Sequence, residues 1–213
     1  MNGSQQALEQ ACASVGLDQD GARLLRLGSN AVYHLKTPVI VRVSRPGTDI
    51  TPVRRSVAVA RWLQQVDYPA VRVIDVDQPV ITDGYIVTFW ESVSDDGDQF
   101  ATTPEIAEIL ARLHHLNTPA NLDLPPLDPF ANAAPRIDAT AWLPPHDRSY
   151  LTDKLAELQD GYASLEFVLP QGVIHGDASI GNVLRDRQGA PVLIDLDGFA
   201  VGPREWDLIL TAI

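Results

Sequence analysis

The sequence predicts an α+β fold with two lobes, a β-rich N-terminal lobe and a mainly helical C-terminal lobe. Three observations support this prediction. Short apolar segments separated by turn residues dominate the chain up to residue 90, the stretch ESVSDDGDQFATTP (91–104) is polar and acidic, and apolar residues beyond it recur at helical spacing. We therefore expect an N-terminal lobe with its connecting segment over residues 1–92 and a C-terminal lobe over residues 93–213.

Three antiparallel strands are expected first, between residues 22 and 43. The segments ARLLRL and AVYHLK flank the turn GSN (28–30), and PVIVRV follows a second turn. Further along the chain, Asp83-Gly84 separates two apolar runs, a pattern that favours a β-hairpin. The N-terminal lobe should therefore contain a sheet of about five strands.

One helix should cross this sheet. In TPVRRSVAVARWLQQV (51–66), Thr51 fits the N-cap and Pro52 fits the first helical position. The apolar residues that recur on one face of this helix are Val53, Val57, Ala60 and Leu63.

Two helices are predicted in the C-terminal lobe. Thr103 should cap the first and Pro104 should begin it. Its apolar face comprises Ile106, Ile109, Leu110, Leu113 and Leu116. The proline-rich stretch 119–145 is expected to form a loop or short turns, and the second helix should begin at Asp147. The residues of the second helix that should point inward are Leu151, Leu155, Leu158 and Tyr162.

Composition and charge restrict the class of protein. Hydrophobic residues make up 45% of the chain and charged residues 21%, which is typical of a soluble globular protein. The single cysteine, Cys12, excludes an intramolecular disulfide and favours a reducing compartment, so we expect a cytoplasmic protein. No apolar run approaches the roughly 18 residues that a membrane helix needs. A net charge of -12 argues against a nucleic-acid partner, because phosphate backbones are bound through clustered Lys and Arg.

Polar residues gather in the segment GVIHGDASIGNVLRDRQGAPVLIDLDGFA (172–200). It reads as a short strand, a loop and a hairpin. If the hairpin is symmetric about Gln188 and Gly189, Asn182 faces Asp195 at about 5 Å. An amide oxygen and a carboxylate that close together suit Mg²⁺ that also binds substrate phosphates.

Two further carboxylates belong to the same segment. Asp177 lies five residues before Asn182, across the loop, and is close enough to act on a substrate. Asp197 shares a face with Asp195 by the strand period and could be the metal ligand instead. Asp177 and Asn182 could also simply cap turns, which both residue types favour.

The motif HGDASIGN followed by LIDLD resembles the His-x-Asp-x-x-x-x-Asn motif and downstream Asp of the aminoglycoside phosphotransferase family, the small-molecule relatives of protein kinases. LGSNAVYHL, PVIVRVSRP, the linker after VTFW and the ARLHHL helix occur in the same order as in that family. The resemblance implies a protein-kinase-like fold with ATP between the lobes. It also implies that the chain transfers the γ-phosphate of ATP, with Mg²⁺, to a hydroxyl of a small polar acceptor.

The resemblance also implies roles for individual residues. Asp177 would be the catalytic base, Asn182 and Asp195 would bind Mg²⁺, and Arg42 would contact the nucleotide phosphates. The notable departures from the family are Arg42, where its aminoglycoside-modifying members have Lys, and a helix 51–66 without Asp or Glu, where Ser56 stands near the expected carboxylate.

The resemblance places the rest of the nucleotide site at a turn and a hinge. Gly28, Ser29 and Asn30 would offer backbone N–H groups to phosphate oxygens, although they could form a simple hairpin turn. The segment TFWE (88–91), with Phe89 and Trp90, would be the hinge whose backbone contacts adenine.

Three residues are expected to have supporting roles. Asp207, after GPREW, would hold the catalytic loop through hydrogen bonds, a role that the resemblance suggests. For His175 we expect a structural hydrogen-bonding role, and for His114 a packing or capping role.

Two other functions remain open at this stage. A kinase-shaped module that binds nucleotide or metabolite without transfer is compatible with the missing helix carboxylate. A metal-dependent hydrolase would want more His or carboxylate ligands. If the chain is a kinase, the acidic residues Asp95, Asp96 and Asp98 favour a cationic acceptor such as an amino sugar.

The last segment, REWDLILTAI, carries an apolar stripe of helical spacing that breaks off after about two turns. The residues of this stripe are Trp206, Ile209, Leu210 and Ile213. Relatives in the family continue through further helices, so we expect an incomplete C-terminal lobe with exposed apolar surface. Such a surface favours self-association.

Overall fold

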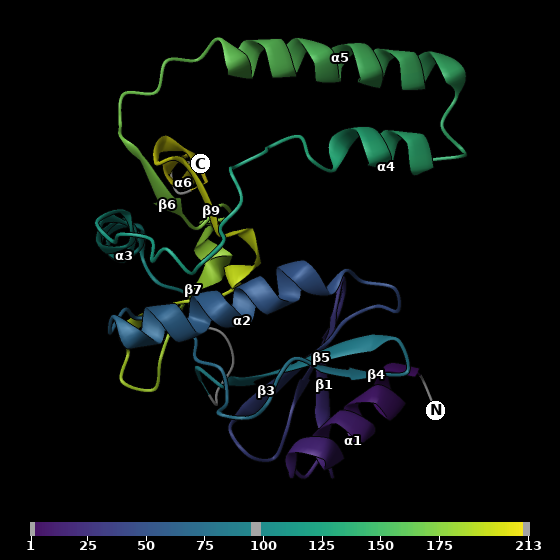
Figure 1. Ribbon diagram of the computed structural model, residues 1–213, viewed down its shortest axis with the longest axis vertical. Helices are drawn as coiled ribbons and strands as arrows, with labels where there is room; N and C mark the ends of the chain where they lie inside the picture. Colours follow the sequence, from purple (N-terminus) through teal and green to yellow (C-terminus); the bar gives the residue numbers. More distant parts are fainter. Residues whose placement is uncertain (1–2, 95–98, 211–213) are drawn as a thin grey trace.

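Five strands of the N-terminal lobe form one antiparallel sheet in the computed structural model, which describes residues 3–94 and 99–210 (Figure 1). The strands are β1 (Arg23–Leu27), β2 (Ala31–His34), β3 (Val39–Val43), β4 (Val80–Thr82) and β5 (Tyr85–Glu91). Their order in the sheet is β1-β2-β3-β5-β4. The predicted strands and hairpin are confirmed, and Asp83 and Gly84 take the positive φ angles of 48° and 79° that a tight two-residue turn requires.

The two faces of this sheet have different neighbours. Helix α1 (Gly3–Val15), which the sequence reading missed, covers one face, where Tyr33, Val41 and Phe89 are buried (Figure 1). The small residues on its buried side, among them Ala11 and Cys12, gave only a weak apolar signal. Because side chains alternate along a strand, the opposite face presents another set of residues to the C-terminal lobe.

Helix α2 (Ile50–Gln65) lies between the sheet and the C-terminal lobe (Figure 1). Its N-cap is Asp49, whose Oδ1 accepts a hydrogen bond of 2.9 Å from the Thr51 backbone N–H, so the predicted cap at Thr51 is wrong by two residues. A carboxylate placed two residues before a free backbone N–H is a strong cap. Trp62 and Leu63 of α2 are buried in a core that the helix shares with the C-terminal lobe.

Helix α3 (Thr103–His114) buries the predicted face Ile106, Ile109, Leu110 and Leu113. Its cap is Thr102 and not the predicted Thr103. The Glu105 carboxylate accepts from the backbone N–H and the hydroxyl of Thr102 at 2.7 and 2.6 Å. This reciprocal box needs a Glu three residues after the cap, which only Thr102 has.

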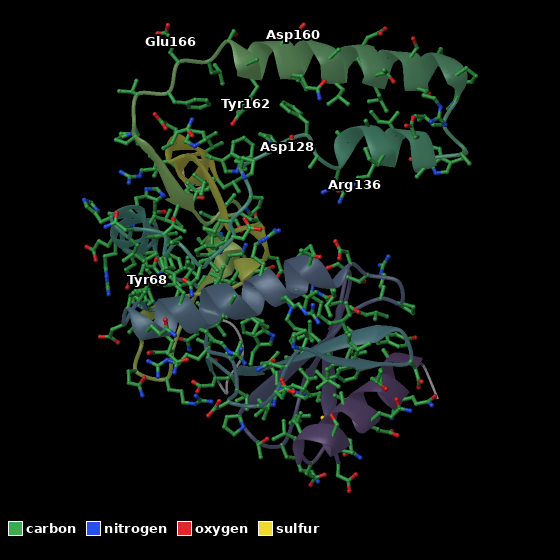
Figure 2. All side chains as sticks on the ribbon, in the orientation of Figure 1. Tyr68, Asp128, Arg136, Asp160, Tyr162 and Glu166 are labelled. Carbon is green, nitrogen blue, oxygen red and sulfur yellow. The ribbon has the colours of Figure 1, made fainter. Side chains whose placement is uncertain are left out.

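Tyr68 joins α3 to the segment that follows α2. Its hydroxyl donates a 2.8 Å hydrogen bond to the Ile109 carbonyl, and burial raises its pKa. The Arg112 guanidinium lies 5.7 Å above the Tyr68 ring. Figure 2 shows Tyr68 near the C-terminal end of α2, and its side chain belongs to the core to which both lobes contribute.

The helices α4 (Ala133–Ala139) and α5 (Pro145–Ala163) form what we call the helical arm, residues 133–163. The proline-rich stretch therefore contains a helix where a loop was predicted, and α5 begins at Pro145 and not at Asp147. Of the predicted inward face of α5, Tyr162 does pack on other aromatic residues, whereas Leu151 and Leu158 are 39% and 53% exposed and no residue of the helix is buried. The two helices lie alongside each other, apart from the rest of the lobe (Figure 1).

An aromatic cluster connects the arm to the lobe, and it comprises Phe130, Tyr162, Phe167 and Trp206. Tyr162 is its centre, with ring centroids 5.8 Å from Phe130, 5.7 Å from Phe167 and 6.4 Å from Trp206. Figure 2 shows Tyr162 beneath α5 and close to Asp128. Partial burial and then the Asp128 carboxylate raise the pKa of Tyr162.

Two small sheets complete the lobe. The first pairs β6 (Gln171–Ile174) with β9 (Ala200–Pro203), and the second pairs β7 (Val183–Arg185) with β8 (Pro191–Leu193). Helix α6 (Glu205–Ile209) follows β9. Of the predicted C-terminal stripe, Trp206 packs on Tyr162, Ile209 is 51% exposed, and Ile213 lies outside the described residues, as do Asp95, Asp96 and Asp98.

Within residues 3–94 and 99–210, the structure contains no helix with the length and apolar character needed to cross a membrane.

Candidate active site

The β7–β8 hairpin carries the polar motif, but its register differs from the predicted one. Val183 pairs with Leu193, and the Ile194 N–H donates to the Asn182 carbonyl at 2.9 Å, so Asn182 lies opposite Ile194 and not Asp195. The turn has three residues, because Asp186 and Ala190 pair across it. Gly189 adopts a φ of 82° there, which glycine permits without strain.

Asp195 does not lie on a strand. Strand β8 ends at Leu193, Asp195 has a left-handed φ of 57°, and residues 196–198 form a single 3₁₀ turn. The strand period therefore does not relate Asp195 to Asp197, contrary to the sequence-based expectation.

A close crossing of two backbones brings the polar residues together. Gly176 has a φ of 83°, and a Cβ atom added there would lie 2.2 Å from the Gly198 carbonyl oxygen. A Cβ atom on Gly198 would lie 2.8 Å from the His175 carbonyl oxygen. The loop 175–182 thus crosses the loop 195–199 with no room for side chains. We call this contact the loop crossing.

The surroundings of Asp195 at the loop crossing raise the pKa of its carboxyl group. Partial removal from water is the main cause that raises the pKa of this carboxyl group, and the carboxylates of Asp197 and Asp177 raise it further. The Arg42 guanidinium acts in the opposite direction. Three acidic side chains from two loops therefore share one region, which a cation would stabilise.

Asn182 and Asp177 are connected directly. The Asn182 Nδ2 donates to the Asp177 carbonyl at 2.8 Å and to its carboxylate Oδ2 at 3.0 Å. Because the amide nitrogen is used in this way, the Asn182 Oδ1 is the atom that could ligate a metal ion. Among the described residues, no group of three His, Cys, Asp and Glu side chains is arranged to hold a metal ion.

Asp207 supports the loop crossing from below, as predicted. This carboxylate is completely buried and accepts hydrogen bonds from the backbone N–H groups of His175 at 2.8 Å and Gly176 at 2.9 Å. His114 of α3 lies 2.9 Å from the same carboxylate, a contact that sequence reasoning missed. A histidine at the end of an apolar helix gives no signal for such a partner.

His175 is a structural residue, which confirms its predicted role. It is fully buried, its Nε2 donates to the Ile194 carbonyl at 2.9 Å, and its Nδ1 accepts from the Asp177 N–H at 3.3 Å. The imidazole therefore connects the two loops of the crossing. Trp206 adds a third support, because its Nε1 donates to the Gly176 carbonyl at 3.0 Å.

A cleft of about 590 Å³ separates the sheet from the loop crossing. Its lining includes Arg42 and Trp90 from the sheet and Leu184, Ile194 and Asp195 from the C-terminal lobe. A volume of this size is typical of small-molecule sites. Its apolar walls and charged end could accept a ligand with a flat apolar part and a charged part.

The structure brings some of the predicted nucleotide residues to this cleft and not others. Ser29 and Asn30 line it, whereas the Gly28 N–H is already bonded to the Asn30 carbonyl at 3.0 Å. Phe89 is fully buried on the α1 side of the sheet, and its backbone N–H donates to the Gln78 Oε1 at 2.8 Å. Trp90 and Glu91 of the predicted hinge do line the cleft, and the lining continues through Ser92, Val93 and Ser94.

Arg42 is held at the charged end of the cleft. Its Nη2 lies 2.6 Å from the Asp197 Oδ2 and 3.4 Å from the Asp195 Oδ1. The Ser56 hydroxyl donates to the Asp197 Oδ1 at 2.7 Å. Ser56 belongs to α2, so the contact joins a strand, a helix and the loop crossing.

Comparison with known proteins identifies relatives that match most of this chain. The model of the phosphotransferase enzyme family, APH, matches residues 22–213. A probable ketoamine kinase of Lactiplantibacillus plantarum is 30% identical over 188 residues, which covers 79% of this chain. The match covers 64% of that kinase, so the chain spans less than two thirds of its length.

Solved structures share the two-lobed fold. The aminoglycoside phosphotransferase APH(3'')-Id from Streptomyces rimosus has a TM-score of 0.74 and 20% identity, with coverage of 97% of this chain and 81% of that one. The amicoumacin kinase hAmiN, solved in complex with AMP-PNP, Ca²⁺ and Ami, has a TM-score of 0.71 and 14% identity, with coverage of 96% of this chain and 66% of that one. These similarities confirm the predicted fold.

Proposed function

Because this chain belongs to the phosphotransferase enzyme family, we propose that it is a small-molecule kinase, which moves the γ-phosphate of ATP to a hydroxyl group. In this proposal residues 1–92 bind the nucleotide and residues 93–213 supply the catalytic groups. The observation that carries it is the loop crossing, which gathers Asp177, Asn182 and Asp195 beside the cleft that contains Arg42.

Asp177 is the proposed catalytic base. Asn182 orients its carboxylate through the 3.0 Å hydrogen bond to Oδ2, and His175 and Asp207 fix the backbone N–H groups of Asp177 and of the preceding Gly176. In the reaction the acceptor oxygen forms a bond to the γ-phosphorus, the bond to the β–γ bridging oxygen breaks, and the acceptor proton passes to the Asp177 carboxylate. Transfer of this kind depends mainly on positioning and charge neutralisation, which a fixed carboxylate and nearby cations supply.

Mg²⁺ fits the donor set at the crossing. The Asn182 Oδ1 and the Asp195 carboxylate are hard oxygen ligands. Burial is the main cause that raises the pKa of Asp195, and the neighbouring carboxylates of Asp197 and Asp177 also raise it. When bound, the metal ion would neutralise phosphate charge that the protein alone leaves uncompensated. Arg42 then contributes the positive charge on the sheet side of the cleft.

We propose a ketoamine as the acceptor, since the ketoamine kinase of Lactiplantibacillus plantarum is 30% identical to this chain. Such molecules carry hydroxyl groups beside an amine that is protonated at neutral pH. A cationic acceptor also agrees with the net charge of -12.

A phosphate-transfer assay tests this proposal. Purified protein is incubated with Mg²⁺, radiolabelled ATP and a panel of ketoamines, aminoglycosides, amino alcohols and neutral sugars. We expect labelled product with ketoamines, and a loss of at least about 10³-fold in kcat for Asp177→Asn with nucleotide affinity preserved. The matched control is Asp77→Asn, which makes the same chemical change at an exposed carboxylate outside the cleft lining. Transfer that survives in Asp177→Asn would show that the assigned base is wrong.

The second candidate is a kinase-shaped binding module. The observation in its favour is the ion pair between Arg42 and the two carboxylates, which occupies the charged end of the cleft. Nucleotide binding by calorimetry together with no labelled product across the whole panel would favour this candidate over a kinase.

A further inference from the structure

Arg42, a cationic residue of the cleft lining, has its carboxylate partner in the opposite lobe. Arg42 belongs to β3, and helix α2, which packs beside it, contains no Asp or Glu anywhere from Ile50 to Gln65. The 2.6 Å partner of the Arg42 Nη2 is instead Asp197, which belongs to the loop crossing. Charge-assisted contacts of this length are the strong ones.

The two carboxylates near Arg42 are used differently. Both oxygens of Asp197 have close donors, since Oδ2 receives Arg42 at 2.6 Å and Oδ1 receives the Ser56 hydroxyl at 2.7 Å. Asp195 meets Arg42 at only 3.4 Å, through one oxygen. Asp195 therefore keeps more of its coordination capacity for a metal ion, whereas that of Asp197 is committed to protein donors.

Ser56 connects this pair to α2. Its side chain is buried, with 2% exposure, and it lies 2.7 Å from the Asp197 Oδ1 and 3.0 Å from the Pro52 carbonyl. A hydroxyl has one hydrogen, and the charged, nearer oxygen is the better acceptor. The Ser56 hydroxyl thus fixes a carboxylate that comes from another segment of the chain.

We propose that Asp197 is a positioning residue that holds Arg42 in the cleft, and that Ser56 holds Asp197. The catalytic consequence of this inference rests on the proposed kinase function. Of the two carboxylates, Asp195 and Asp197, only Asp195 is then assigned to metal binding. The phosphate-binding cation is then fixed only when the two lobes are together, because one partner comes from each lobe.

The first test needs neither nucleotide nor activity. Thermal unfolding is measured for Arg42→Gln, Asp197→Asn and the double variant, without nucleotide or metal. If the residues pair as proposed, each single change lowers the midpoint by roughly 2 °C or more, and the double variant unfolds no lower than the less stable single variant. Ser56→Ala should lower the midpoint in the wild-type background and not in the Asp197→Asn background. Ser56→Thr should retain the hydroxyl and recover the loss.

The second test separates positioning from metal binding. AMP-PNP affinity is measured by calorimetry as Mg²⁺ is titrated, for Asp195→Asn, Asp197→Asn and the control Asp77→Asn. Loss of a metal ligand should raise the half-saturating Mg²⁺ concentration about tenfold or more in Asp195→Asn. Asp197→Asn should leave it within about twofold of wild type, because its carboxylate serves Arg42.

Where transfer is measurable, Asp197→Asn and Ser56→Ala should lower kcat more than they change the acceptor KM, since a misplaced cation affects the transition state. Additive midpoints for Arg42 and Asp197 would overturn the proposal, as would an equal Mg²⁺ shift in Asp195→Asn and Asp197→Asn. If no acceptor is ever phosphorylated, the proposed function fails, yet the unfolding cycle and the Mg²⁺ titration still decide the roles of Asp197 and Ser56.

Discussion

The loop crossing and the helical arm belong to the same lobe, yet different contacts hold them in place. At the crossing, Asp207 and His175 are fully buried and bond to backbone groups, and Gly176 touches Gly198 without side chains between them. In the arm, residues 133–163, no residue is buried. The crossing thus has little freedom to rearrange, whereas the arm can move or change sequence at low cost.

This contrast bears on the proposed phosphate transfer, because such chemistry needs groups held within fractions of an ångström, and buried hydrogen bonds supply that. Tyr162 and Trp206 connect the arm to the crossing, because Trp206 contacts both Tyr162 and the Gly176 carbonyl.

The largest expected effect comes from removal of the buried carboxylate. Asp207→Ala leaves the N–H groups of His175 and Gly176 and the His114 ring without their acceptor. We expect a loss of about 3–5 kcal/mol in the free energy of unfolding, measured with urea. Asp153→Ala, at an exposed position of the arm, should stay within about 0.5 kcal/mol of wild type. Similar losses for both variants would contradict the contrast.

Replacement of a glycine by alanine should change the free energy of unfolding in opposite directions in the two regions. Gly176→Ala must place a Cβ atom at a φ of 83° and 2.2 Å from the Gly198 carbonyl oxygen, so we expect a loss of about 2–4 kcal/mol. Gly161→Ala lies inside α5 with no atom within 4 Å of the added Cβ, and helix propensity should stabilise it by about 0.5–1 kcal/mol. Urea unfolding of both variants checks the signs. A Gly176→Ala protein as stable as wild type would mean that the two loops do not cross as described.

The smallest effect should remain local to the arm. Tyr162→Leu removes three aromatic contacts, each worth about 0.5–1.5 kcal/mol beyond area burial. Backbone amides of α5 should then exchange with deuterium roughly tenfold faster, while amides of β6 and β9 keep their protection, because the arm opens without the crossing. Tyr150→Leu, an exposed aromatic of the same helix, is the control. Faster exchange across β6 and β9 as well would show that the arm and the crossing form one cooperative unit.

Much of the fold could be read from local pattern. The strands up to Val43, the Asp83-Gly84 hairpin and the buried face of α3 follow from apolar periodicity and turn chemistry, which depend on neighbours in the chain. Helix caps were misplaced by one or two residues because Asp49 and Thr102 compete with adjacent Thr residues that satisfy the same rule. The same periodicity predicted that Leu151 and Leu158 of α5 face inward, and this failed, because a stripe of leucines does not say whether another element lies against it.

The candidate site was found by its residue types and not by its geometry. The sequence by itself determined that Asp177, Asn182 and Asp195 belong to one motif, since their spacing matches a known family. The hairpin register depended on whether the turn used two residues or three, a choice made by the Asp186–Ala190 pairing. Only the tertiary structure decided that Phe89 faces α1, that His114 meets Asp207, and that Asp197 meets both Arg42 and Ser56. These contacts join residues up to 155 positions apart, and no local propensity encodes such a distance, because they exist only after the core of each lobe has packed and brought the loops together.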